Sequence, residues 1–229
     1  MSILNIYGDS GQEEIGGYGI DISTQRTDSL DIAMLRWVDS IGPQALRVVD
    51  LGCGKGGQAI RLAALGCEVM AVDIQDFSKQ IAETLQEKKL PRESVRFIKS
   101  DIRHTPEYLT GLYNLVYSQR TFHYIDYKDA QKLLKRIGRH FVKDQSSRLF
   151  ISVSGIDSEL GENYADRNKP IKYRFCHLDK KMQHKHKILL PVCLYSLKEL
   201  EKLLLDCNYE IEKIYQSEFG NIKAIAWPK

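Results

Sequence analysis

The chain has 229 residues, of which 43% are hydrophobic and 28% charged, and its formal net charge is +3. This is the composition of an ordinary globular protein, with a length that fits one domain, and it excludes disordered and fibrous classes. No apolar run approaches the roughly 18 to 20 uncharged residues of a membrane span, and residues 1–12 lack a basic start followed by an apolar stretch, so we expect no membrane association and a cytoplasmic location.

The first segment, residues 1–44, is expected to form an N-terminal lid and one helix. Residues 1–28 are polar and rich in glycine, which is typical of an arm or lid without periodic structure. From Ser29 onward apolar residues recur at near-helical spacing, and the pair Gly42-Pro43 ends this pattern.

Residues 45–153 alternate between strand and helix patterns and are expected to form a cofactor-binding core. Residues 45–51 are a short apolar run, the pattern of a strand buried on both faces of a parallel sheet. A glycine-rich turn follows. The further elements expected in this core are helices over 58–65, 78–89 and 128–141, and strands over 67–74, 95–98, 115–117 and 149–153.

Residues 192–229 carry a helix pattern over 196–207 and two strand patterns, 209–215 and 222–227, which a short turn joins into an antiparallel hairpin. Together with the alternation upstream, this predicts one domain of the α/β class. We expect a Rossmann-like, doubly wound, mostly parallel seven-stranded sheet with an antiparallel C-terminal hairpin strand at its edge.

The turn after the first strand, with Asp50 before Gly52 and Gly54, allows the backbone to approach a nucleoside ligand closely. Gly52, Gly54 and Gly57 also satisfy the spacing of dinucleotide-binding folds, so the glycines alone leave NAD open. The Asp50 carboxylate would repel a diphosphate and attract an ammonium group, which favours S-adenosylmethionine. Asp73 stands 19 positions after Gly54, where an acid accepts hydrogen bonds from ribose hydroxyls in folds of this kind.

Val49-Asp50-Leu51-Gly52-Cys53-Gly54-Lys55-Gly56 resembles the first motif of class I S-adenosylmethionine-dependent methyltransferases, and the resemblance extends in order over residues 29–153. It implies a methyltransferase with S-adenosyl-L-methionine as its cofactor. The cofactor-binding residues that the resemblance implies are Asp50, Gly52, Gly54 and Gly56 in the turn, Asp73 on the ribose, Ile74 on the adenine, Asp101 with its neighbour Ile102 at the adenine amino group, and Ser118 at the methionine part. From the residues alone, a helix-packing turn for the glycines and helix-capping roles for Asp73 and Asp101 stay open.

The segment Arg120-Thr121-Phe122-His123-Tyr124-Ile125 follows the fourth strand, at the end of the sheet where ligands bind in open α/β folds. His123 is the candidate catalytic base or substrate contact, Arg120 would orient an anionic substrate, and Tyr124 would form a wall of the pocket. A structural role for His123 or a contact with the cofactor is the alternative. The segment lacks the Asn-Pro-Pro-Tyr or Asp-Pro-Pro-Tyr signature of methyltransferases that act on bases and on glutamine. It resembles the Ser-x-x-x-x-His-His turn of small-molecule and wobble-uridine methyltransferases, with Tyr124 in place of the second histidine.

Residues 155–191 are an insertion that we expect to be a basic substrate cap. Within it, residues 167–187 hold eight Lys or Arg against one acid, Asp179, a charge of +7. With Tyr173 and Phe175 among the cations, this segment suits RNA, although a solvated basic loop is the alternative. The pair His184 and His186 lacks an acid or cysteine partner nearby in the sequence, and the five cysteines form no CxxC pair, so neither a metal site nor a disulfide framework is expected.

The leading hypothesis is therefore a methyltransferase that transfers the methyl group by in-line displacement to a small-molecule acceptor, without a metal. Three alternatives remain at this point. They are a methyltransferase acting on tRNA or another RNA through the basic segment, a nonenzymatic module that binds S-adenosylmethionine to regulate a partner, and an NAD-dependent oxidoreductase.

Overall fold

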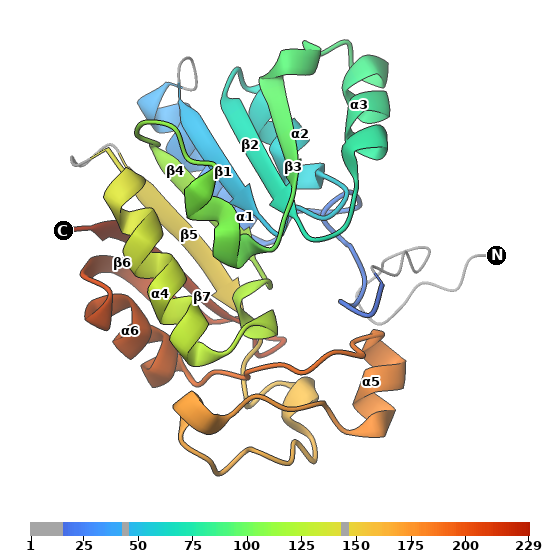
Figure 1. Cartoon of the computed structure of the whole chain (residues 1–229), viewed down its shortest axis with the longest axis vertical. Helices are drawn as coiled ribbons and strands as arrows, with labels where there is room; N and C mark the ends of the chain where they lie inside the picture. The colour runs from blue at the N-terminus through green and yellow to red at the C-terminus, as the bar shows by residue number, and fades with distance from the viewer. Residues whose placement is uncertain (1–15, 43–45, 143–146) are drawn as a thin grey trace.

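A seven-stranded sheet runs through the molecule in the strand order β3-β2-β1-β4-β5-β7-β6 (Figure 1). The computed structural model describes residues 16–42, 46–142 and 147–229, so residues 1–15 of the expected lid lie outside the described residues. The strands are β1 (Arg47–Leu51), β2 (Glu68–Asp73), β3 (Val95–Lys99), β4 (Leu115–Gln119), β5 (Arg148–Val153), β6 (Tyr209–Gln216) and β7 (Ile222–Pro228).

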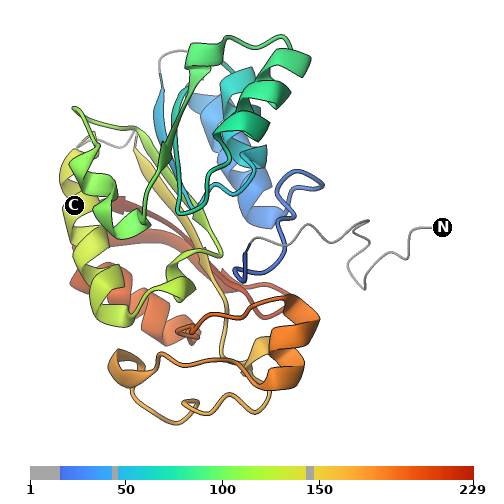
Figure 2. The ribbon, with the colours of Figure 1, turned by 45° about the vertical axis from the view of Figure 1, so that its right-hand side comes forward.

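Helices cover both faces of the sheet, as in a doubly wound fold (Figures 1 and 2). One apolar core lies between the sheet and α4 and α6, and a second lies between the sheet and α1, α2 and α3. The helices are α1 (Ser29–Ile41), α2 (Gly57–Ala64), α3 (Ser78–Glu87), α4 (Tyr127–Ile137), α5 (Lys180–His186) and α6 (Leu197–Asp206). The expected fold class is confirmed, and the expected elements of the core lie within a few residues of their observed bounds.

Local sequence signals fix the ends of the main helices. Asp28 caps α1 in a capping box with Asp31, and Ser196 caps α6 in the same way with Glu199. In such a box each side chain accepts a hydrogen bond from the other residue's backbone N–H, so helix donors that lack a partner are satisfied. Both caps place the start of a helix beside the carboxyl end of the sheet.

The position of the antiparallel strand differs from the expectation. β7 pairs antiparallel with β5 on one side and with β6 on the other, so it lies inside the sheet, and β6 forms the edge. The prediction that the antiparallel strand lies at the edge of the sheet was therefore wrong. The cause is burial: Ile222 to Ala226 are all buried, whereas β6 alternates with exposed charges such as Glu210 and Lys213 and contains a register shift near Ile211, both typical of an edge strand.

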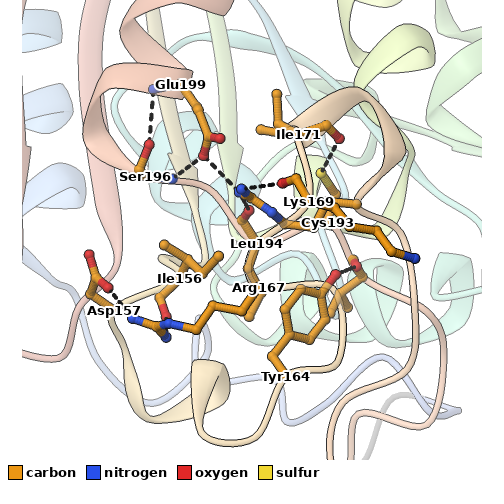
Figure 3. Close-up of polar contacts among 12 residues, drawn as sticks. Ile156, Asp157, Tyr164, Arg167, Lys169, Ile171, Cys193, Leu194, Ser196 and Glu199 are labelled. Carbon is orange, nitrogen blue, oxygen red and sulfur yellow. Dashed lines mark hydrogen bonds and ion pairs between the residues drawn. The ribbon is translucent and has the colours of Figure 1, made fainter.

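The insertion after β5 folds beside the carboxyl end of the sheet and has a small core of its own (Figure 2). Its apolar residues Ile156, Leu160, Met182 and Val192 are buried together. It contains α5, a helix that the sequence pattern did not predict. Figure 3 shows how polar contacts close the loop, with Arg167 reaching both the Asp157 carboxylate at 2.6 Å and the Ile156 carbonyl at 2.7 Å.

Most cations of the basic segment are engaged in ion pairs. The whole insertion, residues 155–191, holds eight bases and five acids, a net charge of 8 − 5 = +3. Five of the eight bases pair with acids, in the pairs Arg167–Asp157, Lys169–Asp166, Arg174–Glu199, Lys181–Glu162 and Lys185–Glu159. The charge of the segment is therefore largely compensated within the protein, which the count over residues 167–187 alone does not reveal.

Candidate active site

A cavity of about 780 Å³ opens at the carboxyl ends of β1, β2 and β4, at the point where the strand order reverses. This is the usual ligand position in open α/β sheets, and the volume lies toward the upper end of the roughly 300–1,000 Å³ typical of ligand sites. Its walls are the glycine turn, residues 18–29 of the N-terminal arm, the segment after β4, the insertion and the β6–β7 turn.

Asp50 ends β1 at the floor of this cavity. Its side chain is 2% exposed, and its Oδ2 atom has no hydrogen-bond partner among the described residues. Burial, together with the negative charges of Asp73, Asp31 and Asp21, raises the pKa of Asp50 to about 8. A buried carboxylate with one oxygen unpaired is costly, so this position suits a ligand with a positive group.

The glycine turn has the conformation that its sequence predicts. Gly52 and Gly54 both have positive φ, 69° and 52°, and both line the cavity. A Cβ atom on Gly52 would lie 2.2 Å from the Thr121 hydroxyl oxygen, so only glycine fits there. Gly56 does not line the cavity; it begins α2 at φ 80°, and a Cβ atom there would meet Ile81 at 2.6 Å, so its role in this structure is close packing of the turn.

Asp73 ends β2 and holds the glycine turn. Its Oδ2 accepts a hydrogen bond from the Gly54 N–H at 2.9 Å, and its Oδ1 accepts one from the Gln75 N–H at 3.0 Å. Burial raises the pKa of Asp73, an effect that these backbone donors partly oppose. Each oxygen keeps a second lone pair, and the side chain lines the cavity, so the carboxylate can also accept hydrogen bonds from ribose hydroxyls.

Asp101 lines the cavity, and its carboxylate is hydrogen-bonded to the side chain of Arg103, which also lines the cavity. Its Oδ1 accepts from Arg103 Nε at 3.0 Å and its Oδ2 from Arg103 Nη2 at 2.6 Å. The side-chain and backbone hydrogen bonds from Arg103 hold the pKa of Asp101 low in spite of burial, which raises it. The sequence analysis missed Arg103, a neighbour that fixes the orientation of this carboxylate.

Three further predicted cofactor residues have different positions. Ile74 is 42% exposed and Ile102 is buried, and both line the cavity. Ser118 does not line it: its side chain is fully buried, and its hydroxyl donates to the Leu51 carbonyl at 3.2 Å. The residues beside it, Tyr117 and Gln119, line the cavity in its place.

His123, Tyr124 and Arg120 come from the segment after β4, and all three line the cavity. The His123 ring packs against Tyr124 with 4.2 Å between ring centroids, and its Nε2 lies 3.4 Å from the Ser154 hydroxyl. Burial and the nearby Arg120 charge lower the pKa of His123 to about 3. So weak a base is a poor proton acceptor at neutral pH, and the structure favours His123 as a substrate or cofactor contact rather than as the base.

Arg120 has φ 53°, a left-handed conformation that non-glycine residues rarely adopt. Its backbone N–H donates to the Ser152 carbonyl at 2.9 Å, which holds this conformation at the end of β4. Its side chain lines the cavity, and among the described residues it forms no hydrogen bond or ion pair. Strained residues cluster at functional sites, and a guanidinium in this position can bind an anionic group.

The N-terminal arm contains contacts that the sequence analysis missed. The buried Asp21 accepts from the Lys55 N–H of the glycine turn at 2.7 Å. On the other side the Gly19 N–H donates to the Lys187 carbonyl of the insertion at 3.0 Å, and the Tyr124 hydroxyl donates to the Tyr18 carbonyl at 2.6 Å. The arm therefore lies across the cavity between the glycine turn and the insertion.

A buried ion pair fixes the base of the arm. Lys223 on β7 is 3% exposed and donates to Asp28 Oδ2 at 2.7 Å, where Gln119 Nε2 also donates at 2.5 Å. Asp28 and Lys223 are 195 positions apart in the chain, so no local pattern links them.

The residues around the glycine turn fit S-adenosylmethionine. Asp50 has an unpaired buried oxygen that suits an ammonium group, and Asp73, which is hydrogen-bonded to the turn, keeps lone pairs that can accept from ribose hydroxyls. The acids Asp21, Asp50 and Asp73 all line this part of the cavity, which suits a cationic cofactor and opposes a pyrophosphate. Among the described residues, no group of three or more His, Cys, Asp or Glu is placed to hold a metal ion, and no helix there is long and apolar enough to cross a membrane.

Comparisons with known proteins agree with this geometry. Residues 48–144 match the family described as "Methyltransferase domain". Cypemycin N-terminal methyltransferase from Streptomyces is 32% identical over 110 residues, which cover 47% of this chain and 42% of that protein. The chain spans well under half the length of the curated relatives it matches, 26% of one and 42% of the other.

Solved structures share the fold over nearly the whole chain. Magnesium protoporphyrin IX methyltransferase from Synechocystis, with bound S-adenosylhomocysteine, aligns with a TM-score of 0.65 and 18% identity over 98% of this chain and 91% of that one. The 1,6-didemethyltoxoflavin-N1-methyltransferase of Burkholderia thailandensis aligns with a TM-score of 0.62 and 18% identity over 90% and 80% of the two chains. Residues 48–144 are therefore similar to a methyltransferase domain, and the chain shares the fold of these solved methyltransferases. The resemblance seen in residues 49–56 agrees with this match.

Proposed function

We propose that this protein transfers a methyl group from S-adenosylmethionine to a small-molecule acceptor that carries an anionic group. The observation that carries the proposal is Asp50, a buried carboxylate on the cavity floor whose Oδ2 has no partner among the described residues. The ammonium of the methionine part of the cofactor would supply that partner. When bound, S-adenosylmethionine provides a methyl group activated by its positive sulfur, which an acceptor displaces in line.

The chain's own residues bind and orient the two ligands. Asp50 and Asp73 would hold the methionine and ribose parts, and the arm from Tyr18 to Ser23 would cover them and limit the access of water. Arg120 would hold the anionic group of the acceptor by charge-assisted hydrogen bonds, which fixes its orientation toward the methyl group.

Two observations support a small acceptor rather than RNA. The arm, the insertion and the β6–β7 turn all border the cavity, which favours a compact ligand. Most cations of the basic segment are paired with acids, which leaves fewer of them for phosphates. The two methyltransferases of known structure described above carry small molecules in their names, magnesium protoporphyrin IX and 1,6-didemethyltoxoflavin.

The test is to incubate the protein with methyl-labelled S-adenosylmethionine and cell extract, and then to separate metabolites, RNA and protein. We expect label in the metabolite fraction. Label confined to RNA, with binding that weakens steeply as salt rises, would replace the proposed acceptor by RNA. Absence of label from every fraction, with the cofactor still bound, would indicate a nonenzymatic binding module.

Arg120→Gln tests the anionic acceptor in the same assay. We expect at least a tenfold loss of labelling, because a charge-assisted hydrogen bond contributes about 1.5–3 kcal/mol, while the Kd for S-adenosylhomocysteine stays within about threefold. Arg139→Gln is the matched control, since Arg139 is exposed and lies outside the cavity lining. Equal labelling by the two variants would refute the role of Arg120.

A further inference from the structure

The acceptor end of the cavity contains a second histidine, His186, which differs from His123 in its surroundings. His186 is the last residue of α5, and it lines the cavity together with Glu159 from the short 3₁₀ turn Glu159–Gly161. Its Nε2 lies 3.1 Å from Glu159 Oε2. Its other ring nitrogen, Nδ1, has no hydrogen-bond partner among the described residues.

This pair has the geometry of a base held by a carboxylate. Glu159 fixes the ring, because its carboxylate accepts a hydrogen bond from the Nε2–H of the neutral imidazole, which leaves the lone pair on Nδ1. The second oxygen of Glu159 is held by Lys185, which keeps the carboxylate ionised and in place. His123 has no such carboxylate partner: its Nε2 lies beside the Ser154 hydroxyl, and its buried Nδ1 has no hydrogen-bond partner among the described residues.

The N-terminal arm passes close to His186 and Tyr124. A Cβ atom added to Gly19 would lie 3.4 Å from the Tyr124 hydroxyl and 3.5 Å from the His186 backbone carbonyl oxygen, so both atoms are near neighbours of Gly19. Tyr124 in turn packs on His123. Both histidines and Tyr124 line the same cavity.

The pKa of His186 depends on its burial and on the charges that face it. Burial lowers the pKa of His186 below its usual value, and the Glu159 carboxylate partly offsets this effect, while Lys185 acts in the same direction as burial. The ring is thus uncharged at neutral pH, and the imidazolium that forms on proton uptake is stabilised by Glu159.

We propose that His186 is the catalytic base of the methyl transfer and that Glu159 is its positioning residue. This inference rests on the proposed function and names its acceptor class, a protic nucleophile such as an amine or a hydroxyl group. The lone pair of the acceptor atom forms the new bond to the methyl carbon, and the electron pair of the breaking carbon–sulfur bond stays on sulfur. The acceptor proton passes to Nδ1 of His186 and from there to solvent.

The test compares His186→Gln and Glu159→Gln with wild type, in the labelling assay with the metabolite fraction from pH 5 to 10. His186→Gln should lower the rate by roughly 10²- to 10³-fold and remove the acidic limb of the pH profile, as expected for loss of a general base. Glu159→Gln should retain the limb but move it to lower pH. The Kd for S-adenosylhomocysteine, measured by calorimetry, should stay within about threefold in both variants, which shows that they are folded.

His184→Gln is the matched control, because His184 is exposed, lies on the same short helix and does not line the cavity. It should behave as wild type. A His186→Gln protein that labels the metabolite fraction at the wild-type rate, or with the wild-type pH profile, overturns the inference and leaves the proposed function intact. Wild-type protein that labels no fraction overturns both.

A measurement without an acceptor tests the same pair. Nitrogen-15 NMR of the imidazole should show the proton of neutral His186 on Nε2, and the pKa of His186 should fall in Glu159→Gln, since the carboxylate raises it. A proton on Nδ1, or a pKa that does not respond to Glu159→Gln, would contradict the assignment.

Discussion

Replacement of Asp50 by Asn should move stability and cofactor affinity in opposite directions. The side chain is buried at the end of β1, and burial with three neighbouring acids raises its pKa from 3.8 to about 8. Asn has nearly the same shape and no charge to desolvate. The folded protein should therefore gain stability from the change, while the cofactor loses the partner of its ammonium group.

The pKa shift sets the size and the pH window of the effect on stability. Each pKa unit corresponds to about 1.4 kcal/mol, so a shift of about four units corresponds to at most about 6 kcal/mol, and water in the cavity reduces this. Because the folded pKa of Asp50 is raised, its favourable contribution is complete below the unfolded value near 3.8 and is lost as the pH rises through about 8. Asp50→Asn should thus raise the free energy of unfolding by about 3 kcal/mol at pH 8 and by almost nothing at pH 4.

Urea unfolding at the two pH values and calorimetric titration with S-adenosylhomocysteine measure the two effects. We expect the variant to bind about 10- to 100-fold more weakly, as for loss of a hydrogen bond between charged groups. Asp76→Asn is the control, since Asp76 is exposed and lies outside the cavity lining. A variant that is no more stable than wild type at pH 8 and binds the ligand equally well would refute the role given to Asp50.

Two further substitutions test the contacts of the arm. Alanine at position 57 suits the first turn of α2, but its Cβ atom would lie 2.4 Å from the Ser23 backbone and would displace the arm. In Gly57→Ala, S-adenosylhomocysteine should therefore dissociate at least tenfold faster in stopped-flow measurements. An unchanged rate would mean that the arm does not retain the ligand. Lys223→Met leaves the half-buried Asp28 without its cation and should lower the free energy of unfolding by about 2 kcal/mol at pH 7. Burial raises the pKa of Asp28, but the contact with Lys223 outweighs this effect and lowers it. The stabilisation that the ion pair provides is therefore present above pH 3.8 and is lost as the pH falls through the folded pKa. A loss of stability in Lys223→Met that persists unchanged in strong acid would contradict this account.

The cofactor half of the cavity was predictable because its determinants are local. The glycines at 52 and 54 and the acids at the ends of β1 and β2 lie at fixed spacings, and the parallel strands bring those ends to one edge of the sheet. The internal position of β7 was also predictable from the sequence. Residues 222–226 read as a continuous apolar run apart from Lys223, the pattern of an internal strand, whereas β6 alternates with charges.

The acceptor half was much less predictable because its contacts join distant parts of the chain. His186 stands 27 positions after its carboxylate partner Glu159, and the pattern around His184 and His186 suggested no partner at all. The burial of His123, which makes it a weak base, arises from packing around Tyr124 and is not visible in the segment that follows β4. Ion pairing across the insertion likewise depends on how the loop closes on itself (Figure 3).

The position of the arm should determine the order in which the two products are released. The Asp21 carboxylate of the arm accepts a hydrogen bond from the glycine turn, and the Gly19 N–H donates one to the insertion, so a displacement of the arm that breaks one contact also loosens the other. An acceptor that packs under residues 18–19 would lengthen the residence of the cofactor, and the spent cofactor would leave after the methylated product. Steady-state kinetics should therefore follow an ordered sequence, with S-adenosylhomocysteine as the last molecule released.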